Sequence, residues 1–120
     1  MVVTELCTSS MAVSDTVHLQ PKFASVSGST SGNNTLVAAV TAKKVRVVAG
    51  VFVGAGAVTL ALQTGASGTG ITGVMSLVTG TPLVWPFNPL GYCETASGAL
   101  LNMSLGGAVQ VSGCLVYVEV

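Results

Sequence analysis

Few side chains in this 120-residue sequence could carry out acid–base or nucleophilic chemistry. The acids are Glu5, Asp15, Glu94 and Glu119, and the single histidine is His18. Acid–base catalysis needs convergent groups within hydrogen-bond reach, and no two of these residues share a recognisable sequence context. No serine lies in a Gly-x-Ser-x-Gly elbow, and no cysteine and histidine are arranged as a nucleophile and its base. We therefore expect a protein that is not an enzyme and that has no catalytic residue, cofactor or metal site.

One glycine motif has a possible ligand-binding meaning. Residues 68–73 match the Gly-x-Gly-x-x-Gly pattern of dinucleotide-binding loops, and Glu94 follows Gly73 by about 20 residues, as the ribose-binding acid does in that fold. The phosphate-binding loop also requires a strand before it and a helix after it. Residues 74–78, Val-Met-Ser-Leu-Val, do not have a helical pattern. We interpret the motif as a glycine-rich loop between strands.

The three cysteines, Cys7, Cys93 and Cys114, are odd in number and lack metal-type spacing. A disulfide framework is therefore not expected, and synthesis in a reducing cytoplasm is the simpler interpretation. The N-terminus has no basic region, and Glu5 stands where the apolar core of a signal peptide should be. We therefore expect no export.

Charge is scarce in this chain. Only 7% of the residues are charged, with four basic and four acidic side chains and a net charge of zero, whereas roughly a quarter are charged in ordinary soluble domains. Because half of the residues are hydrophobic, we expect other chains to cover much of the surface. The one basic cluster, Lys43, Lys44 and Arg46, could meet a phosphate or an acidic partner, or could solubilise a turn and block a sheet edge. The zero net charge argues against direct nucleic-acid binding.

A long uncharged stretch raises the question of a membrane segment. No charged residue lies between Arg46 and Glu94, and Thr59 is the only polar residue in 47–62. A membrane-spanning helix needs about 20 predominantly apolar residues. This stretch is shorter, rich in β-branched residues, interrupted by glycines and alternating in its second half. We therefore expect no membrane segment.

The elements that would position any site are predicted best around residues 43–64. Residues 45–53 are almost continuously apolar and rich in valine, which is typical of a strand covered on both faces. Gly54 and Gly56 interrupt the run, and residues 57–63 then alternate in the manner of a half-buried strand. These features predict a central β-hairpin.

The whole chain predicts one all-β domain. Further short strands are separated by turns every 8 to 12 residues or so, which brings the total to about eight and is typical of a sandwich or barrel. We expect an N-terminal arm or leading segment at residues 1–21 and a β-sandwich domain at residues 22–120. The alternation of the last strand changes phase at Gly113, which predicts a β-bulge there.

The two prolines in Pro86-Phe87-Asn88-Pro89 predict a shaped loop rather than a strand. Two large aromatic residues, Trp85 and Phe87, lie in or next to this loop and are expected to attach it to the body of the fold.

Four segments together resemble a known family. They are residues 34–47 (NTLVAAVTAKKVRV), 56–60 (GAVTL), 86–95 (PFNPLGYCET) and 115–120 (LVYVEV). This combination resembles the small virion proteins of tailed bacteriophages that act as head decoration, or cement, proteins. The resemblance implies a jelly-roll-like β-sandwich that forms small oligomers on the outside of the capsid and bridges neighbouring major capsid subunits.

The resemblance also implies partners and a location. We expect the major capsid protein as one partner and further copies of the chain as the other, as a homotrimer in the first place and a dimer in the second. The protein would be synthesised in the bacterial host cytoplasm and would act on the capsid exterior. The candidate capsid or oligomer contacts are Lys43, Lys44, Arg46, Trp85 and Phe87, and we expect the N-terminal arm to take part in docking.

Two alternatives stay open. The first is another virion component, such as a head-fibre base or a tail or receptor-binding module. The second is a carbohydrate-binding β-sandwich in which Trp85, Phe87 and Tyr92 would form a stacking surface. Because aromatic side chains beside prolines usually pack a loop onto the core, we favour packing for these three residues.

Overall fold

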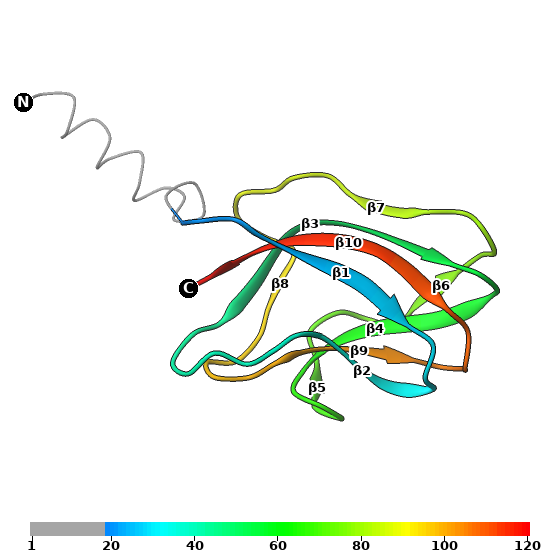
Figure 1. Cartoon of the computed structure of the whole chain (residues 1–120), viewed down its shortest axis with the longest axis horizontal. Helices are drawn as coiled ribbons and strands as arrows, with labels where there is room; N and C mark the ends of the chain where they lie inside the picture. The colour runs from blue at the N-terminus through cyan, green and yellow to red at the C-terminus, as the bar shows by residue number, and fades with distance from the viewer. Residues whose placement is uncertain (1–18) are drawn as a thin grey trace, which may run out of the picture.

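The computed structural model describes residues 19–120, and every regular element in this range is a β-strand (Figure 1). The strands are β1 (Lys22–Gly28), β2 (Gly32–Val37), β3 (Val45–Gly54), β4 (Val58–Thr64), β5 (Thr69–Gly70), β6 (Met75–Leu77), β7 (Leu83–Trp85), β8 (Cys93–Glu94), β9 (Leu101–Leu105) and β10 (Val111–Glu119). The prediction of an all-β fold is confirmed.

The strands form two antiparallel sheets that pack face to face. Sheet A has the order β1-β10-β3-β7, and β8 pairs with β3 beside β7. Sheet B has the order β2-β9-β4-β5, and β6 pairs with β4 beside β5. When β5 and β6 count as one position and β7 and β8 as another, this is the eight-position order of a jelly roll. The predicted jelly-roll-like sandwich is therefore confirmed.

The strand count is higher than predicted because two edge positions are broken. Pro86 and Pro89 cannot donate backbone hydrogen bonds, so regular pairing with β3 stops after β7 and resumes at β8. Between them only the N–H groups of Asn88 and Tyr92 donate to β3, each at 2.8 Å. On sheet B, a turn after Gly70 separates β5 from β6. Ten short strands thus occupy the positions of about eight.

The predicted central hairpin is wrong. Strands β3 and β4 follow one another in the chain but lie in different sheets, where β3 pairs with β10 and β4 pairs with β9. The segment between them crosses from one sheet to the other, and the Ala55 N–H donates to the Gln110 carbonyl at 2.8 Å. An alternating pattern predicts that a segment is a strand, but it does not identify the strand's partner.

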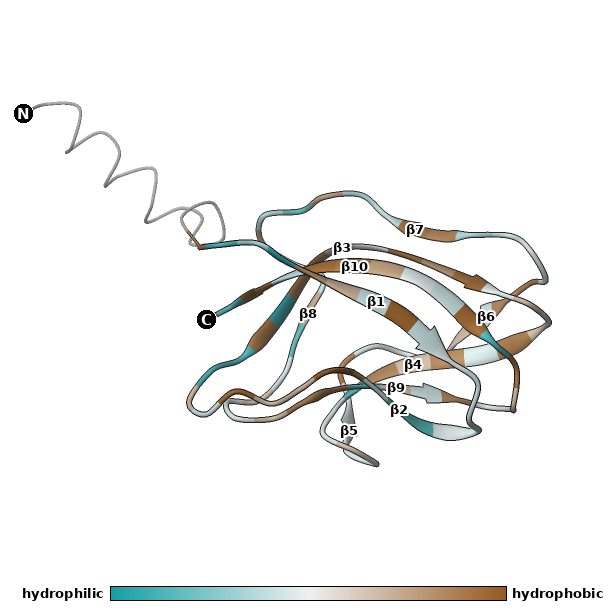
Figure 2. Cartoon of the chain, viewed as in Figure 1, coloured by the Kyte–Doolittle hydropathy of each residue, from teal (hydrophilic) through white to brown (hydrophobic). Residues whose placement is uncertain are grey.

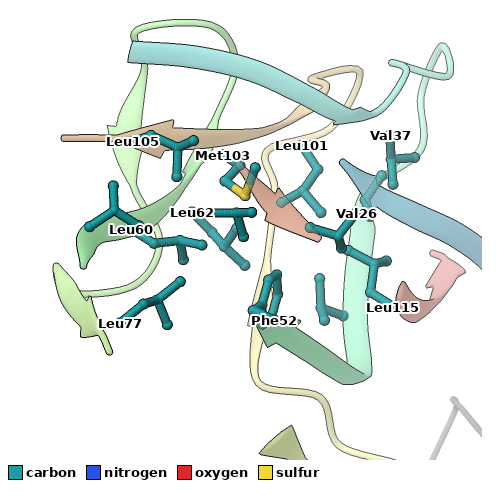
Figure 3. Close-up of a cluster of buried hydrophobic side chains, with 14 residues drawn as sticks. Val26, Val37, Phe52, Leu60, Leu62, Leu77, Leu101, Met103, Leu105 and Leu115 are labelled. Atoms are coloured by element: carbon teal, nitrogen blue, oxygen red, sulfur yellow. The ribbon is translucent and has the colours of Figure 1, made fainter. Parts of the chain in front are cut away.

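The core lies between the two sheets and is built from the inward side chains of both. Figure 3 shows these side chains converging from strands that are far apart in the sequence. The larger members are Val26, Val37, Phe52, Leu60, Leu62, Leu77, Leu101, Met103, Leu105 and Leu115. All are buried, so the alternation of each strand settles which of its faces points inward.

The predicted bulge at Gly113 is also wrong. Gly113 pairs in register with Phe52, and Val111 and Leu115 on either side of it face the core together. The register shift between β10 and β3 falls later, between Val116 and Tyr117. Gly113 has another role, which is to let two backbones approach closely. Its φ is 151°, and a Cβ atom there would lie 1.9 Å from the Val51 carbonyl oxygen.

The predicted N-terminal arm falls largely on residues that the structure does not describe. Strand β1 begins at Lys22, where the sequence places the start of the sandwich domain. The arm itself stays a prediction. Four chemically interesting residues also lie outside the described range: Glu5, Cys7, Asp15 and His18.

Candidate protein-interaction surface

The outer face of sheet A is the most unusual surface among the described residues. Strand register assigns its side chains, because residues two apart on a strand point to the same side. Since Val26, Phe52 and Leu115 face the core, their immediate neighbours face outward. We define the outer face of sheet A as Phe23, Ser25, Ser27, Ala49, Val51, Val53, Val84, Ser112, Cys114 and Val116.

These residues form three rows across the sheet. Phe23, Val116 and Ala49 are directly paired in the first row. The middle row runs through Ser25, Cys114, Val51 and Val84, and so spans all four strands. The third row contains Ser27, Ser112 and Val53.

No member of the outer face of sheet A carries a charge, and several apolar members are open to solvent. Phe23 is 81% exposed and Val84 is 57% exposed. No other described strand packs over this face. Figure 2 shows hydrophobic residues along much of β3 and β10, the two central strands of the sheet. Three of the ten members are serines and the others are apolar residues or cysteine. An uncharged, mainly apolar sheet surface of this kind is typical of an interface with another protein chain.

The outer face of sheet B has the opposite character. It presents polar, uncharged side chains that include Asn33, Thr35, Thr59 and Ser104. At its centre Asn102 is fully buried and satisfied within the chain. Its Nδ2 donates to the Asn33 Oδ1 and to the Gln63 Oε1, both at 2.9 Å, and its Oδ1 accepts from a backbone N–H of β2 at 3.0 Å. Sheet B therefore has the polar outer surface that sheet A lacks.

Charge is confined to one end of the sandwich. The described residues include all four basic side chains of the protein, Lys22, Lys43, Lys44 and Arg46, with only Glu94 and Glu119 as acids. Register places them together: Glu119 is opposite Val45, Arg46 is opposite Glu94, and Lys22 donates to Glu119 at 2.8 Å. We call this the charged end. It lies where β3 begins and β10 finishes, and Figure 2 shows hydrophilic residues there.

Lys43 and Lys44 occupy the loop that enters β3 at the charged end. The Lys44 N–H donates to the Val120 carbonyl at 2.8 Å, and the Val120 N–H returns a bond to the Lys44 carbonyl at 3.0 Å. The loop backbone is therefore fastened to the end of β10. Both lysine residues are exposed, and neither takes part in the two ion pairs found among the described residues. Their ammonium groups are available to a partner.

Arg46 has a role within the chain. Its guanidinium Nη2 lies 3.3 Å from the Glu94 Oε1. Its aliphatic stem lies under Gly91, where a Cβ atom would be 2.6 Å from the Arg46 Cγ. Arg46 therefore positions the loop between β7 and β8, and its predicted contact with a partner stays a prediction.

The aromatic residues of this loop divide into two groups. The Trp85 ring meets the Phe52 ring edge-on, with centroids 5.4 Å apart, and stacks on the Tyr92 ring at 4.9 Å. The Tyr92 hydroxyl donates to the Pro86 carbonyl. Trp85 therefore attaches the loop to the core as expected, but Phe87 is 61% exposed and does not. A carbohydrate-stacking surface would need a free Trp85 face, and Tyr92 covers one.

The two described cysteines have different surroundings. Cys93 and Cys114 are both free thiols. Burial raises the pKa of the Cys93 thiol to about 11, so this thiol is protonated and unreactive at neutral pH. Cys114 is exposed in the middle row of the outer face of sheet A. An exposed thiol at the centre of this face is a further reason to expect that another chain covers the face.

The described residues hold no constellation for chemistry. Within 19–120, no group of three or more histidine, cysteine or acidic residues could hold a metal ion. Residues 68–73 contain the two-residue strand β5, which pairs with β4 at the edge of sheet B, and no helix follows them, so the interpretation as a glycine-rich β-loop is confirmed. A depression of about 360 Å³ beside Thr59, Ser76 and Gly106 is lined without any titratable side chain.

Comparisons with known proteins do not identify the chain. No protein-family model matches the sequence, and no curated protein matches it significantly. In the part of the chain that the structure describes, no helix is long and apolar enough to span a membrane.

Sequence reasoning missed the outer face of sheet A, although one signal pointed to it. The continuous apolar pattern of residues 45–53 predicts a strand covered on both faces. No residue of β3 is exposed, but the outward side chains of Ala49, Val51 and Val53 are only half-buried, and no described strand packs over them. Phe23, Cys114 and Val84 join that uncovered surface through strand pairings that are distant in sequence. Their assembly into one face could not be seen before the register was known.

Proposed function

We propose that this protein is a structural virion protein that decorates and stabilises the capsid of a tailed bacteriophage by bridging neighbouring major capsid subunits. The jelly-roll sandwich agrees with the family that the sequence resembles. Its surfaces are suited to assembly, because one sheet face is apolar and uncharged and one end carries the described charges. In the described range these surfaces, and not a cluster of reactive groups, are the distinctive features.

The observation that carries this proposal is the uncovered outer face of sheet A. A protein of this size that worked alone would be expected to place polar or charged residues across the whole face, as the chain does on sheet B, and not only the three serines that this face carries. Closely packed copies on a shell can leave such a face apolar, because other subunits exclude water from it. Assembly therefore accounts for the low charge of the chain and for where the charge is missing.

The charged end is suited to contact with the shell. It holds four basic side chains and two acidic ones, and the acids are already paired with Lys22 and Arg46. Lys43 and Lys44 would therefore meet an acidic surface of the major capsid protein. Complementary charges of this kind mainly orient the partners and speed their association. The predicted N-terminal arm would add a second attachment.

Stabilisation would come from many small contributions. Each bound copy adds an interface across the boundary between capsid subunits, and binding to the assembled state favours that state over its dissociated parts. Copies that associate with one another also bind the shell at several points, which raises the overall affinity. The protein would be synthesised in the bacterial cytoplasm and would act on the capsid exterior as a homo-oligomer, with no direct contact to nucleic acid or membrane.

Copy number in purified virions tests the proposal. Quantitative mass spectrometry of the phage particles that encode the protein should give a ratio to the major capsid protein near one, or a simple fraction of one. A handful of copies per particle would assign the protein to a vertex, fibre or tail component instead. Absence from the particle would reject a virion role.

Binding to undecorated capsids tests the proposed docking residues. The double variant Lys43→Glu, Lys44→Glu should cosediment with capsids at least tenfold more weakly, because both charges are reversed toward an acidic partner. The matched control Lys43→Arg, Lys44→Arg keeps both charges and should bind normally. Deletion of residues 1–20 should abolish capsid binding and leave the β-domain folded. Full binding by the deletion variant would exclude the arm, and full binding by the charge-reversal variant would exclude the lysines.

A further inference from the structure

We propose that the outer face of sheet A packs against the same face of a second copy, across a two-fold axis, so that the protein is a dimer before it meets any other partner. This proposal concerns the purified chain alone and does not depend on the capsid function. It also selects the second of the two oligomeric states expected from the sequence, for the structural reasons that follow.

The charge distribution allows the outer face of sheet A to pack against the same face of a second copy. A two-fold contact places identical residues near one another, so any charge on the face would oppose a like charge. The ten residues of the outer face of sheet A include none. The charged side chains beside the face are Lys22, next to Phe23, and Arg46, near the start of β3, and they are paired with Glu119 and Glu94. Two copies can therefore approach without electrostatic repulsion and without stranding a charge away from water.

Among the described residues, no other surface matches this face. The outer face of sheet B is polar, and its central amide, Asn102, is occupied within the chain. The exposed apolar residues near sheet B, Val74 and Val78, lie in loops and not in a continuous row. The best complement that one copy offers to the outer face of sheet A is thus the same face, which makes the contact isologous and closes it at two copies.

The size of the face predicts a reversible dimer. Ten residue positions, each about 4.8 Å by 6.6 Å, cover roughly 320 Å² on each copy. Two such faces bury on the order of 640 Å², and the exposed ring of Phe23 adds to this area. Because this area is below that of stable specific interfaces, dissociation on dilution should be measurable.

Matched valine substitutions test the proposal on the full-length protein. Val84→Lys places a charge on the outer face of sheet A, and Val74→Lys places the same charge on a loop near sheet B. Val84 and Val74 are 57% and 74% exposed, so neither change should disturb the core. Light scattering coupled to size exclusion should report about twice the 11.9 kDa chain mass for the wild type and for Val74→Lys. Val84→Lys should raise the dimer Kd at least tenfold.

The reactivity of Cys114 tests the same contact independently. Mass spectrometry after a short maleimide treatment should find Cys114 protected at high protein concentration and modified on dilution, or in Val84→Lys at any concentration. A wild-type monomer with Cys114 reactive throughout would overturn the proposal. A monomer with Cys114 protected would also overturn it and would identify residues 1–18 as the cover. A trimer would overturn the two-fold contact even where Val84→Lys dissociates it.

Discussion

Substitution of Gly113 by alanine is the sharpest test of the sheet A register. Gly113 lies in β10, the strand between β1 and β3, and pairs with Phe52. Its φ of 151° is outside the range that alanine adopts readily, and the added Cβ would lie 1.9 Å from the Val51 carbonyl oxygen and 2.8 Å from its carbon. Both neighbours are backbone atoms, so relief requires the two central strands to separate.

Two other glycines separate the two contributions to the loss of stability in Gly113→Ala, which are the unfavourable φ and the steric overlap. Gly107 has an ordinary φ and open space around it, so Gly107→Ala should change the free energy of unfolding by less than about 1 kcal/mol. Gly32 has a φ of 91° but also open space, so Gly32→Ala should cost about 1 kcal/mol for the backbone conformation alone. Gly113→Ala combines an unfavourable φ with a backbone overlap, and we expect a loss of about 4 kcal/mol.

Urea unfolding followed by circular dichroism measures this series. With a slope of about 1.5 kcal/mol per molar urea, a loss of about 4 kcal/mol lowers the midpoint by on the order of 2–3 M. If Gly113→Ala fails to fold, the ordering of the other two variants still tests the backbone term. A Gly113→Ala protein as stable as Gly32→Ala would refute the close approach of β10 to β3.

Two further predictions concern buried groups. Asn102→Ala should lower the free energy of unfolding by about 2–3 kcal/mol, because it removes three hydrogen bonds and leaves the partly buried Asn34 N–H without its acceptor. Thr35→Ala, an exposed change on the same face, should cost under about 0.5 kcal/mol, and thermal melts measure both variants. The raised pKa of Cys93 means that the unfolded state loses its proton first as pH rises, so stability should fall between pH 9 and about 11, by at most about 2 kcal/mol given its partial exposure. Cys93→Ala should lessen that decline while the raised pKa of Lys22, due to Glu119, acts equally in both proteins. Equal slopes in the two proteins, or an unchanged melt for Asn102→Ala, would contradict these assignments.

Local patterns predicted the strands well where each strand has one clear inward face. Residues 101–105 alternate strictly and form β9 at those positions, and the start of β1 at Lys22 is as predicted. The same patterns could not supply partners. Residues 45–53 and 57–63 are adjacent in sequence, so a hairpin is the simplest prediction, but each strand pairs with a distant strand at the centre of its own sheet.

The phase change in the alternation of the last strand shows a second limit of prediction from the sequence pattern. Val116 and Val118 suggested that the apolar face switches sides, which would need a bulge at Gly113. In the structure Leu115 stays on the inner face and Val116 points outward, while Val118, which pairs with Arg46, is fully buried. An apolar residue on the outer side of a strand disturbs alternation in the same way as a bulge does. Sequence alone cannot separate these two causes, because they differ in what covers the second face.

The outer face of sheet A connects the two proposals. Bridging neighbouring capsid subunits requires two attachment points that face the same shell. If the two-fold axis of the proposed dimer runs along the strands, both charged ends point the same way, and each dimer presents two Lys43 and Lys44 pairs together. The two attachments would then reinforce each other, since the second binds at a high effective concentration once the first is made. In that arrangement Val84→Lys, which leaves both lysines intact, should weaken capsid binding as well as dimerisation, whereas Lys43→Glu with Lys44→Glu should weaken capsid binding alone.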